Sequence, residues 1–229
     1  MKFIARKGKL FRLSGVNYTM VESLESATID GVVEAEISPC HFTLFPSSEP
    51  PTALQQIIDD WGLIEHQEGG YFKETDRSPF LMTVLDQHSA VGQGIEGSSG
   101  TVSRNYSTLI YYLLTSNRPI GKFHKNKNRI THILQRGKGQ YVLIYPNGQV
   151  KSFKVGFDYQ NGEISQWVVP GEVYKASFLI PNEEFSNGLL ISEVVVPGFD
   201  FEDHSFMSGR DELVDLVGDE KAAKLEFLL

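Results

Sequence analysis

Hydrophobic and polar residues alternate with a period of two over much of the chain after residue 70. This period is typical of β-strands, in which successive side chains point to opposite faces. Eight such stretches follow one another: 71–76, 107–114, 130–134, 140–145, 150–157, 165–169, 176–180 and 189–196. Their number and spacing predict a mainly β sandwich or barrel.

The segments between these stretches carry turn residues. Pro146-Asn147-Gly148 and Gln160-Asn161-Gly162 are typical of hairpin turns, and Pro170-Gly171 and Pro197-Gly198 of corners. These connections favour antiparallel pairing. The polar, glycine-rich stretch 87–100 predicts a flexible insertion between two strands.

Short helices are predicted at both ends of the β region. The first has Thr52 as its cap and Gly62 as its stop, and its apolar positions have helical spacing: Leu54, Ile57, Ile58 and Trp61. The C-terminal helical segment breaks at Gly218, and its apolar positions are Leu213, Leu216, Val217, Ala222, Ala223 and Leu225. The sequence therefore predicts a single domain over 52–229.

Residues 1–51 differ in composition from this domain and predict an N-terminal arm. Residues 1–19 contain five basic side chains and no acidic one, which is typical of an organelle-targeting presequence and also of a poorly ordered basic tail. Residues 21–51 are rich in Pro, Ser and acids, and predict an irregular connection. We expect a location in the cytoplasm, or also in the nucleus. Targeting to mitochondria by residues 1–19 is the alternative.

Composition narrows the classes of partner. The chain has 229 residues and a formal net charge of −8, which opposes attraction to nucleic acid or to an anionic membrane. Its single cysteine, Cys40, excludes an intrachain disulfide and a Cys-based zinc site, and favours a reducing compartment. No apolar run approaches the ~18 residues of a membrane-spanning helix. We therefore expect a small-molecule partner rather than nucleic acid or membrane.

Three clusters of ionisable residues are candidates for chemistry. The first, 66–78, contains Gly69-Gly70, where backbones can approach closely. The second, 123–132, contains two histidines eight residues apart, which project to the same face of an unbroken strand. In the third, 168–176, only one of Tyr174 and Lys175 can face inward. Each cluster is also consistent with an exposed strand or ordinary polar residues.

The order of these segments resembles the type-5 branch of the cupin superfamily, known as domain of unknown function 985. The resemblance covers about 52–228 and is carried by EGGYFKETDRS, STLIYYLL, GKFHKN, ILQRGKGQYVLIYPNGQVKSFKVG, WVVPG, ASFLIPNEE and EVVVPGFDFEDHSF. It implies a cupin-type double-stranded β-helix, the jelly-roll barrel. It also implies a homodimer, since cupins commonly pair through an edge strand or share sheets, and an exposed barrel edge and the apolar stretch 189–196 favour the same.

The resemblance further implies four positions for metal ligands. Counted back from Gly137, they fall on His124, Asn126, Ile130 and Lys175. Ile130 cannot coordinate, and a protonated Lys175 repels a cation. The resemblance therefore implies no complete metal site and no cofactor. His124, Asn126 and His132 form the alternative ligand set, which corresponds to a metal-dependent cupin oxygenase.

We expect the basic residues to form a cationic hollow at the barrel mouth. Such a hollow suits a small anionic ligand (a sugar, nucleotide-sugar or carboxylate), because Arg binds such groups bidentately and Lys as a point charge. The predicted ligand-binding residues are Tyr71, Lys73, Glu74, Arg77, Asn126, Arg129, His132, Gln140 and Lys175.

The alternative hypothesis is a metal-independent isomerase or epimerase. The resemblance to metal-free cupin epimerases implies a His base and a Tyr acid, here His124 and Tyr111, with His66 and Glu68 as further acid–base groups. Nothing in the sequence distinguishes an enzyme from a binder or from a degenerate, storage-type barrel.

Overall fold

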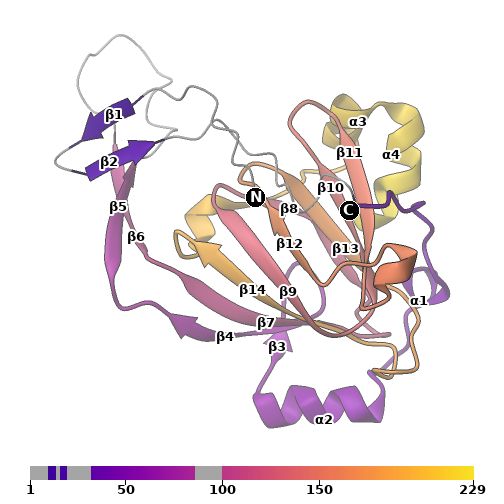
Figure 1. Cartoon of the computed structure of the whole chain (residues 1–229). Coiled ribbons are helices and arrows are strands. Elements are labelled where there is room, and N and C mark those ends of the chain that lie inside the picture. The colour runs from indigo at the N-terminus through magenta and orange to yellow at the C-terminus, as the bar shows by residue number, and fades with distance from the viewer. Residues whose placement is uncertain (1–9, 14–15, 20–31, 86–99) are drawn as a thin grey trace.

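Two antiparallel sheets face each other and form the body of the protein (Figure 1). The computed structural model describes residues 10–13, 16–19, 32–85 and 100–229. In this part of the chain, the larger sheet has the order β12 (Gln166–Val169), β9 (Arg129–Gly137), β14 (Leu189–Val196), β7 (Thr108–Leu114), β4 (Tyr71–Arg77) and β3 (Ile64–Glu65). The facing sheet has the order β11 (Val150–Val155), β10 (Gly139–Ile144), β13 (Tyr174–Leu179), β8 (Ile120–Asn126) and β15 (His204–Phe206). This architecture confirms the mainly β jelly roll.

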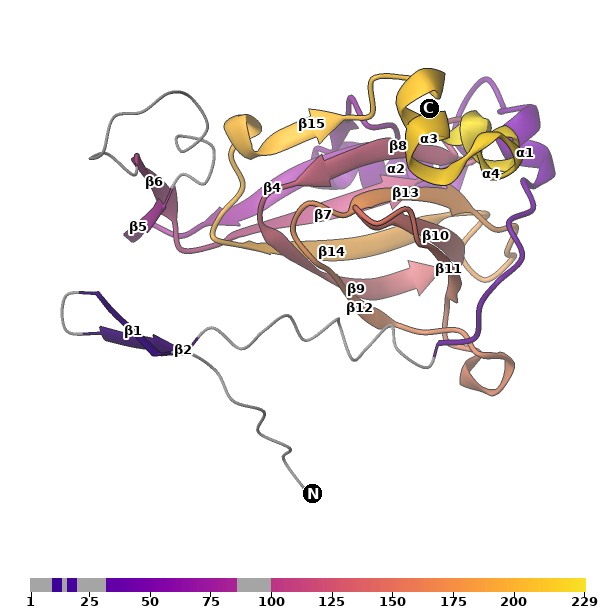
Figure 2. The same cartoon turned by 90° about the horizontal axis from the view of Figure 1, so that it is seen from above.

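Further elements surround the two sheets. A hairpin of β5 (Leu81–Leu85) and β6 (Thr101–Asn105) projects beyond them, as Figures 1 and 2 show, and β1 (Leu10–Leu13) pairs with β2 (Val16–Thr19). The helices and 3₁₀ turns are short: α1 (His41–Leu44), α2 (Thr52–Trp61), η1 (Tyr159–Asn161), η2 (Phe201–Asp203), α3 (Arg210–Val217), α4 (Asp219–Leu225) and η3 (Glu226–Leu228). No helix in the described ranges is long and apolar enough to cross a bilayer.

The eight expected strands are confirmed as β4, β7 and β9 to β14. The turn at 146–148 joins β10 to β11 as a hairpin, as predicted. The hairpin predicted at 160–162 is wrong, because η1 leads from β11 to β12, which belong to different sheets. The expected flexible insertion lies outside the described residues except for Gly100.

Strand β14 does not form an edge of its sheet. It is hydrogen-bonded to β7 on one side and to β9 on the other, and most of it is buried. The apolar stretch 189–196 therefore offers no free strand edge to a second copy, and the homodimer stays a prediction.

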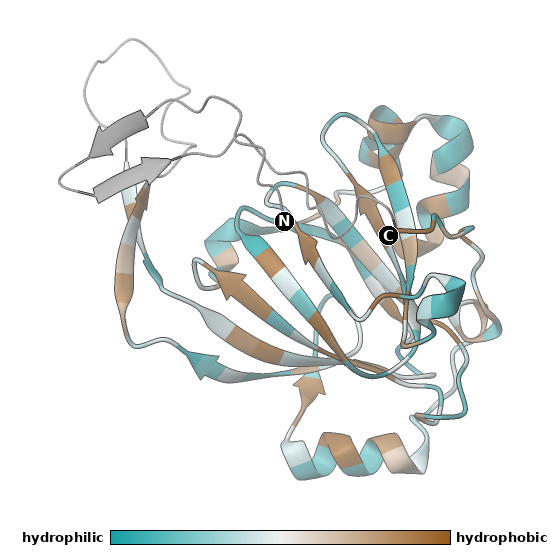
Figure 3. Ribbon diagram, in the orientation of Figure 1, coloured by the Kyte–Doolittle hydropathy of each residue, from teal (hydrophilic) through white to brown (hydrophobic). Residues whose placement is uncertain are grey.

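The side-chain alternation of the strands separates the hydrophobic core into an inner and an outer layer. Tyr141 and Leu143 of β10 pack between the two sheets, whereas Val142 and Ile144 pack on the outer face beneath α3 and α4. Both faces of this strand are therefore buried, which explains its unbroken apolar sequence. Figure 3 shows the brown hydrophobic residues distributed over the barrel strands and the C-terminal helices.

Helix α2 covers the outer face of the larger sheet. Leu54 and Ile58 are buried against Leu113 of β7, and Gly62 ends the helix in the left-handed conformation with φ of 62°. The prediction that Thr52 caps the helix is wrong, because Pro51 occupies the cap position and Thr52 is already helical. Pro51 provides no side-chain hydrogen bond to the start of the helix.

Residues upstream of Thr52 belong to the folded unit. The backbone N–H of Ala35 donates to Ser152 O at 2.9 Å, and Val32, Ile37 and Phe42 pack against the core layers. The folded domain therefore begins before the predicted boundary. The basic stretch 1–19 lies outside the described residues apart from β1 and β2.

We predict that Leu213→Ala lowers the free energy of unfolding by about 2–4 kcal/mol, because it leaves a cavity between α3 and the sheet. Leu213 is fully buried in the outer layer. Chemical denaturation measures the loss, and Asp215→Ala, on the exposed side of the same helix, serves as the control. Equal stability of Leu213→Ala and the control would show that α3 does not stabilise the barrel.

Candidate functional site

The space between the sheets contains a small polar cavity. Its lining residues are Glu68, Tyr112, His124, Tyr141, Lys175, Ala176, Ser177 and Glu193. The space open to the centre of a water molecule is about 10 Å³. A cavity of this size holds about one water molecule or an ion.

A glycine pair brings Glu68 into the barrel. Gly69 has φ of +110°, and a Cβ on it would lie 1.9 Å from Ile120 O, so only glycine allows this approach to β8. The backbone N–H of Lys122 donates to Glu68 O at 2.7 Å and holds the loop in place. The sequence correctly indicated a close backbone approach at this pair.

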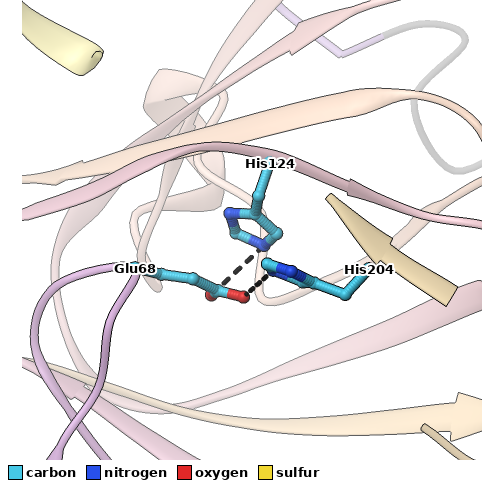
Figure 4. Close-up of side chains that lie close together, drawn as sticks. All are labelled: Glu68, His124 and His204. Carbon is cyan, nitrogen blue, oxygen red and sulfur yellow. Dashed lines mark hydrogen bonds and ion pairs between the residues drawn. The ribbon is translucent and has the colours of Figure 1, made fainter. Parts of the chain in front are cut away.

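Two histidines from neighbouring strands converge on the Glu68 carboxylate, as Figure 4 shows. His124 lies on the inner face of β8, and β15 brings His204 beside it. Nε2 of His204 lies 2.8 Å from Glu68 Oε1, and Nε2 of His124 lies 3.2 Å from Glu68 Oε2. Among the described residues these three form a group whose ligand atoms all lie within 4.8 Å of one another.

The tautomer of His124 leaves one nitrogen without a partner. Its Nδ1 lies 2.7 Å from Lys122 O, and because a carbonyl only accepts, Nδ1 carries the proton. Burial lowers the pKa of His124 to about 3, so the ring is neutral at pH 7. Its Nε2 therefore presents a lone pair, has no hydrogen-bond partner among the described residues, and faces a carboxylate oxygen.

Glu68 remains ionised in this environment. Burial alone would raise the pKa of its carboxyl, but the hydrogen bond from His204 and the charge of Lys175 act in the opposite direction and lower the pKa below its usual range. Half-buried His66 lies beside it, with Nδ1 3.5 Å from Glu68 Oε2. An ionised carboxylate thus faces the lone pair of His124 in a buried site.

A second buried cluster lies on the other side of the cavity. Lys175 of β13 is the cross-strand neighbour of His124, and its Nζ donates to Glu193 Oε2 at 2.7 Å and to His132 Nε2 at 3.0 Å. His132 is fully buried and stacks on Trp167. Burial and the Lys175 charge lower the pKa of His132, which keeps the ring neutral and able to accept the hydrogen bond.

The structure brings together part of the predicted set. Glu68, His124 and Lys175 line the cavity, His132 contacts Lys175, and Asn126 follows His124 on the inner side of β8. The two histidines of the second sequence cluster do not share an unbroken strand. They lie on β8 and β9 of opposite sheets, and both are buried.

The predicted cationic hollow is wrong. Lys73, Arg77 and Arg129 are exposed, and Arg77 pairs with Glu74 at 2.7 Å on the surface of β4. The charged groups that line the cavity are instead two carboxylates, Glu68 and Glu193, and one lysine.

Three other predicted site residues point away from the cavity. Tyr111 contacts Trp61 of α2, Tyr71 packs in the same outer layer, and Gln140 donates to Glu36 O and Ser152 Oγ. Each lies on the outer face of its strand. Because side chains alternate along a strand, the adjacent residue in the sequence faces inward instead.

Sequence reasoning missed Tyr112, Glu193 and His204. Choosing between Tyr111 and Tyr112 requires knowing which face of β7 is inner, and both faces are apolar. Glu193 had a signal, since it is an acid within the apolar run 189–196. His204 lies on a three-residue strand after an irregular segment, so no periodic pattern marks it.

A buried ion pair fixes the segment that carries His204. Arg104 of β6 donates to both carboxylate oxygens of Asp203, at 2.8 and 3.0 Å, and Asn128 donates to Oδ2 at 3.1 Å. Burial would raise the pKa of Asp203, but the hydrogen bonds from Arg104 lower it. The projecting hairpin is thereby connected to the residue that precedes His204.

Comparisons with known proteins agree with this architecture. The model of the family "Cupin superfamily (DUF985)" matches residues 55–207. The uncharacterised protein YML079W of Saccharomyces cerevisiae is 68% identical over 203 residues, which cover 89% of this chain and 99% of the yeast protein.

Solved structures with a similar fold include two proteins without a stated activity. A hypothetical protein from Leishmania major has 23% identity and a TM-score of 0.62, covering 76% of this chain and 97% of that one. Protein SO0799 from Shewanella oneidensis has 22% identity and a TM-score of 0.59, covering 76% and 95%. With the family match over most of the barrel, the chain belongs to the cupin superfamily, in the family of domain of unknown function 985.

Proposed function

We propose that the protein binds one divalent transition-metal ion through Glu68, His124 and His204, and that this ion is the centre of its activity. The observation that carries the proposal is the lone pair of His124 Nε2, which faces Glu68 Oε2 at 3.2 Å without a hydrogen bond. Two electron-rich atoms at this distance in a buried site repel each other unless a proton or a cation lies between them. A metal ion between them would bind both the His124 nitrogen and the Glu68 oxygen and remove this repulsion.

The donor set fits such an ion. Two imidazole nitrogens and one carboxylate oxygen are the ligands of non-haem iron oxygenases and of catalytic zinc sites. The Glu68 oxygens lie 3.2 and 2.8 Å from the two histidine nitrogens, and the ligand atoms of the three residues all lie within 4.8 Å of one another, so small shifts would let them share an ion at about 2.1 Å. The bond from His124 Nδ1 to Lys122 O is the support that metal-binding histidines usually have.

When bound, the ion supplies Lewis-acid activation of an oxygen ligand in the cavity. His204 would hold the ion through Nε2, with its ring proton on Nδ1. Lys175 and Tyr112 face the same cavity and orient the oxygen ligand. The site thus corresponds to a metal-dependent cupin with a ligand set different from the predicted one.

A metal-free acid–base enzyme is the second candidate. His124 Nε2 and the Tyr112 hydroxyl are both buried without a hydrogen-bond partner among the described residues, and both line the cavity. They supply the His base and Tyr acid of the isomerase hypothesis, with Tyr112 in place of Tyr111.

We predict that the metal-free full chain takes up one equivalent of zinc or cobalt, and that Glu68→Gln or His204→Ala weakens this binding at least tenfold. Each substitution removes one of three protein ligands. Equilibrium dialysis with elemental analysis measures the affinity. His41→Ala, at an exposed histidine outside the barrel, is the matched control and should bind as the wild type does.

Two results would contradict the metal proposal. If the wild-type chain takes up no metal, the acid–base candidate is favoured instead. If Glu68→Gln and His204→Ala bind metal as tightly as the His41→Ala control, the ion binds elsewhere. Circular dichroism of each variant establishes that the barrel is folded.

We also predict that Arg104→Met weakens metal binding by about 10- to 100-fold, the usual effect of removing a group that orients a ligand. Its loss leaves Asp203 without its bidentate partner and frees the segment before His204. Arg210→Met is the control, since Arg210 pairs with Asp219 and Glu226 on the C-terminal helices. Unchanged affinity in folded Arg104→Met protein would show that Arg104 does not position His204.

A further inference from the structure

We propose that the β5–β6 hairpin regulates the proposed metal site: in its docked position it holds His204 in the geometry that binds the ion, and its release weakens metal binding. This inference rests on the proposed metal site and concerns its control by a part of the fold that contributes no ligand. Three observations carry it. The hairpin has little packing of its own, it holds both ends of the segment before His204, and its buried contact with that segment can open without leaving a buried charge unpaired.

The hairpin depends on the contacts at its base. Within the described residues its two strands pair only with each other, and they project beyond the two sheets (Figures 1 and 2). Leu81, Thr83 and Ser103 are exposed. A hairpin of two strands is at best marginally stable by itself in water. Its position on the protein is therefore set by the residues that attach it to the barrel.

The base of the hairpin holds both ends of the segment that leads to His204. At the first end, the backbone N–H of Gly198 donates to Asn105 O at 2.8 Å. At the second end, Arg104 donates to both carboxylate oxygens of Asp203. Among the hairpin residues whose burial is described, only Arg104 is buried. The side chain that the hairpin buries is thus the one that holds the residue before the proposed ligand.

Strand β15 restrains His204 only weakly. It has three residues and pairs with β8 over these alone, with His204 opposite Asn126. The 3₁₀ turn η2 ends at His204, whose backbone N–H donates to Phe201 O. The position of the His204 ring therefore follows the position of Asp203, which Arg104 holds.

The contact between Arg104 and Asp203 can open without leaving a buried charge unpaired. Asn128 donates to Asp203 Oδ2 at 3.1 Å, and Lys127 Nζ lies 3.5 Å from Oδ1. The backbone N–H of Lys127 also donates to Asp203 O, at 2.8 Å. These barrel groups stay with Asp203 when the hairpin moves, and the guanidinium of Arg104 passes into water. Breaking a buried ion pair is costly because it leaves a charge buried and unpaired, so the docked and released hairpins are two accessible states.

Coupling between the hairpin and the site acts in both directions. If the docked hairpin strengthens metal binding by some factor, the bound ion favours the docked hairpin by the same factor. Amides that exchange with solvent through local opening report this shift directly. A hairpin that only stabilises the fold would not respond to the ion. We therefore expect metal binding to slow hydrogen exchange in the hairpin, and to do so through Arg104.

The test measures hydrogen exchange of the full chain by mass spectrometry, with and without saturating zinc. In the wild type, zinc should slow exchange several-fold in peptides that cover 81–85 and 101–105. In Arg104→Met, with zinc occupancy confirmed by elemental analysis, this effect should be lost. Peptides of β11, an edge strand with no residue in the cavity lining, are the internal control and should exchange equally with and without zinc. Arg210→Met, on the C-terminal helices, is the control variant and should respond to zinc as the wild type does.

The outcomes separate this inference from the proposed metal site. Failure of the wild type to bind zinc overturns both. Zinc binding that leaves exchange of the hairpin unchanged, or slows it equally in the wild type and in Arg104→Met, overturns only the coupling. If Arg104→Met does not fold, Asp203→Asn replaces it, because it removes the charge that Arg104 holds and should abolish the zinc effect on the hairpin in the same way.

Discussion

The structure depends on the burial of charged groups between two β-sheets. Glu68, Glu193 and Lys175 lie inside the barrel, where each charge needs a partner. The Glu193–Lys175 pair forms within the two sheets, since both residues lie on inner faces of long strands. Glu68 instead enters on a loop, and this requires a glycine with a positive φ, close approach to β8 and two histidines from adjacent strands.

Both faces of the central barrel strands are buried. The inner layer contains the aromatic core and the polar cavity, while α2 packs outside one sheet and α3 and α4 outside the other. A site residue and a core residue can therefore be adjacent in sequence and separated by the thickness of a strand. Tyr111 and Tyr112 are such a pair, and only Tyr112 lines the cavity.

The sequence predicted the eight long strands, the helical ends and the family because these rest on periodicity, turn residues and long matching segments. It predicted Glu68, His124, His132 and Lys175 as site residues, which do meet in or beside the cavity. It did not predict the geometry around them. Lys73, Arg77 and Arg129 are exposed, whereas the equally basic Lys175 is buried. The sequence does not reveal this difference, because the pairing of distant strands decides which face of a strand is inner. His204 and its support from Arg104 connect segments about a hundred residues apart, which local patterns do not reveal.

The three proposed ligands are distributed widely along the chain, and this affects when the site can form. Glu68 and His204 are 136 residues apart, and β15, which carries His204, pairs with β8 over only three residues. A chain still being synthesised has most of the barrel strands before it has His204. The site is therefore completed among the last steps of synthesis and folding, and an unfolded chain brings its ligands together only at a large entropic cost. Occupancy of the site would thus distinguish a finished, correctly folded molecule from a partial one.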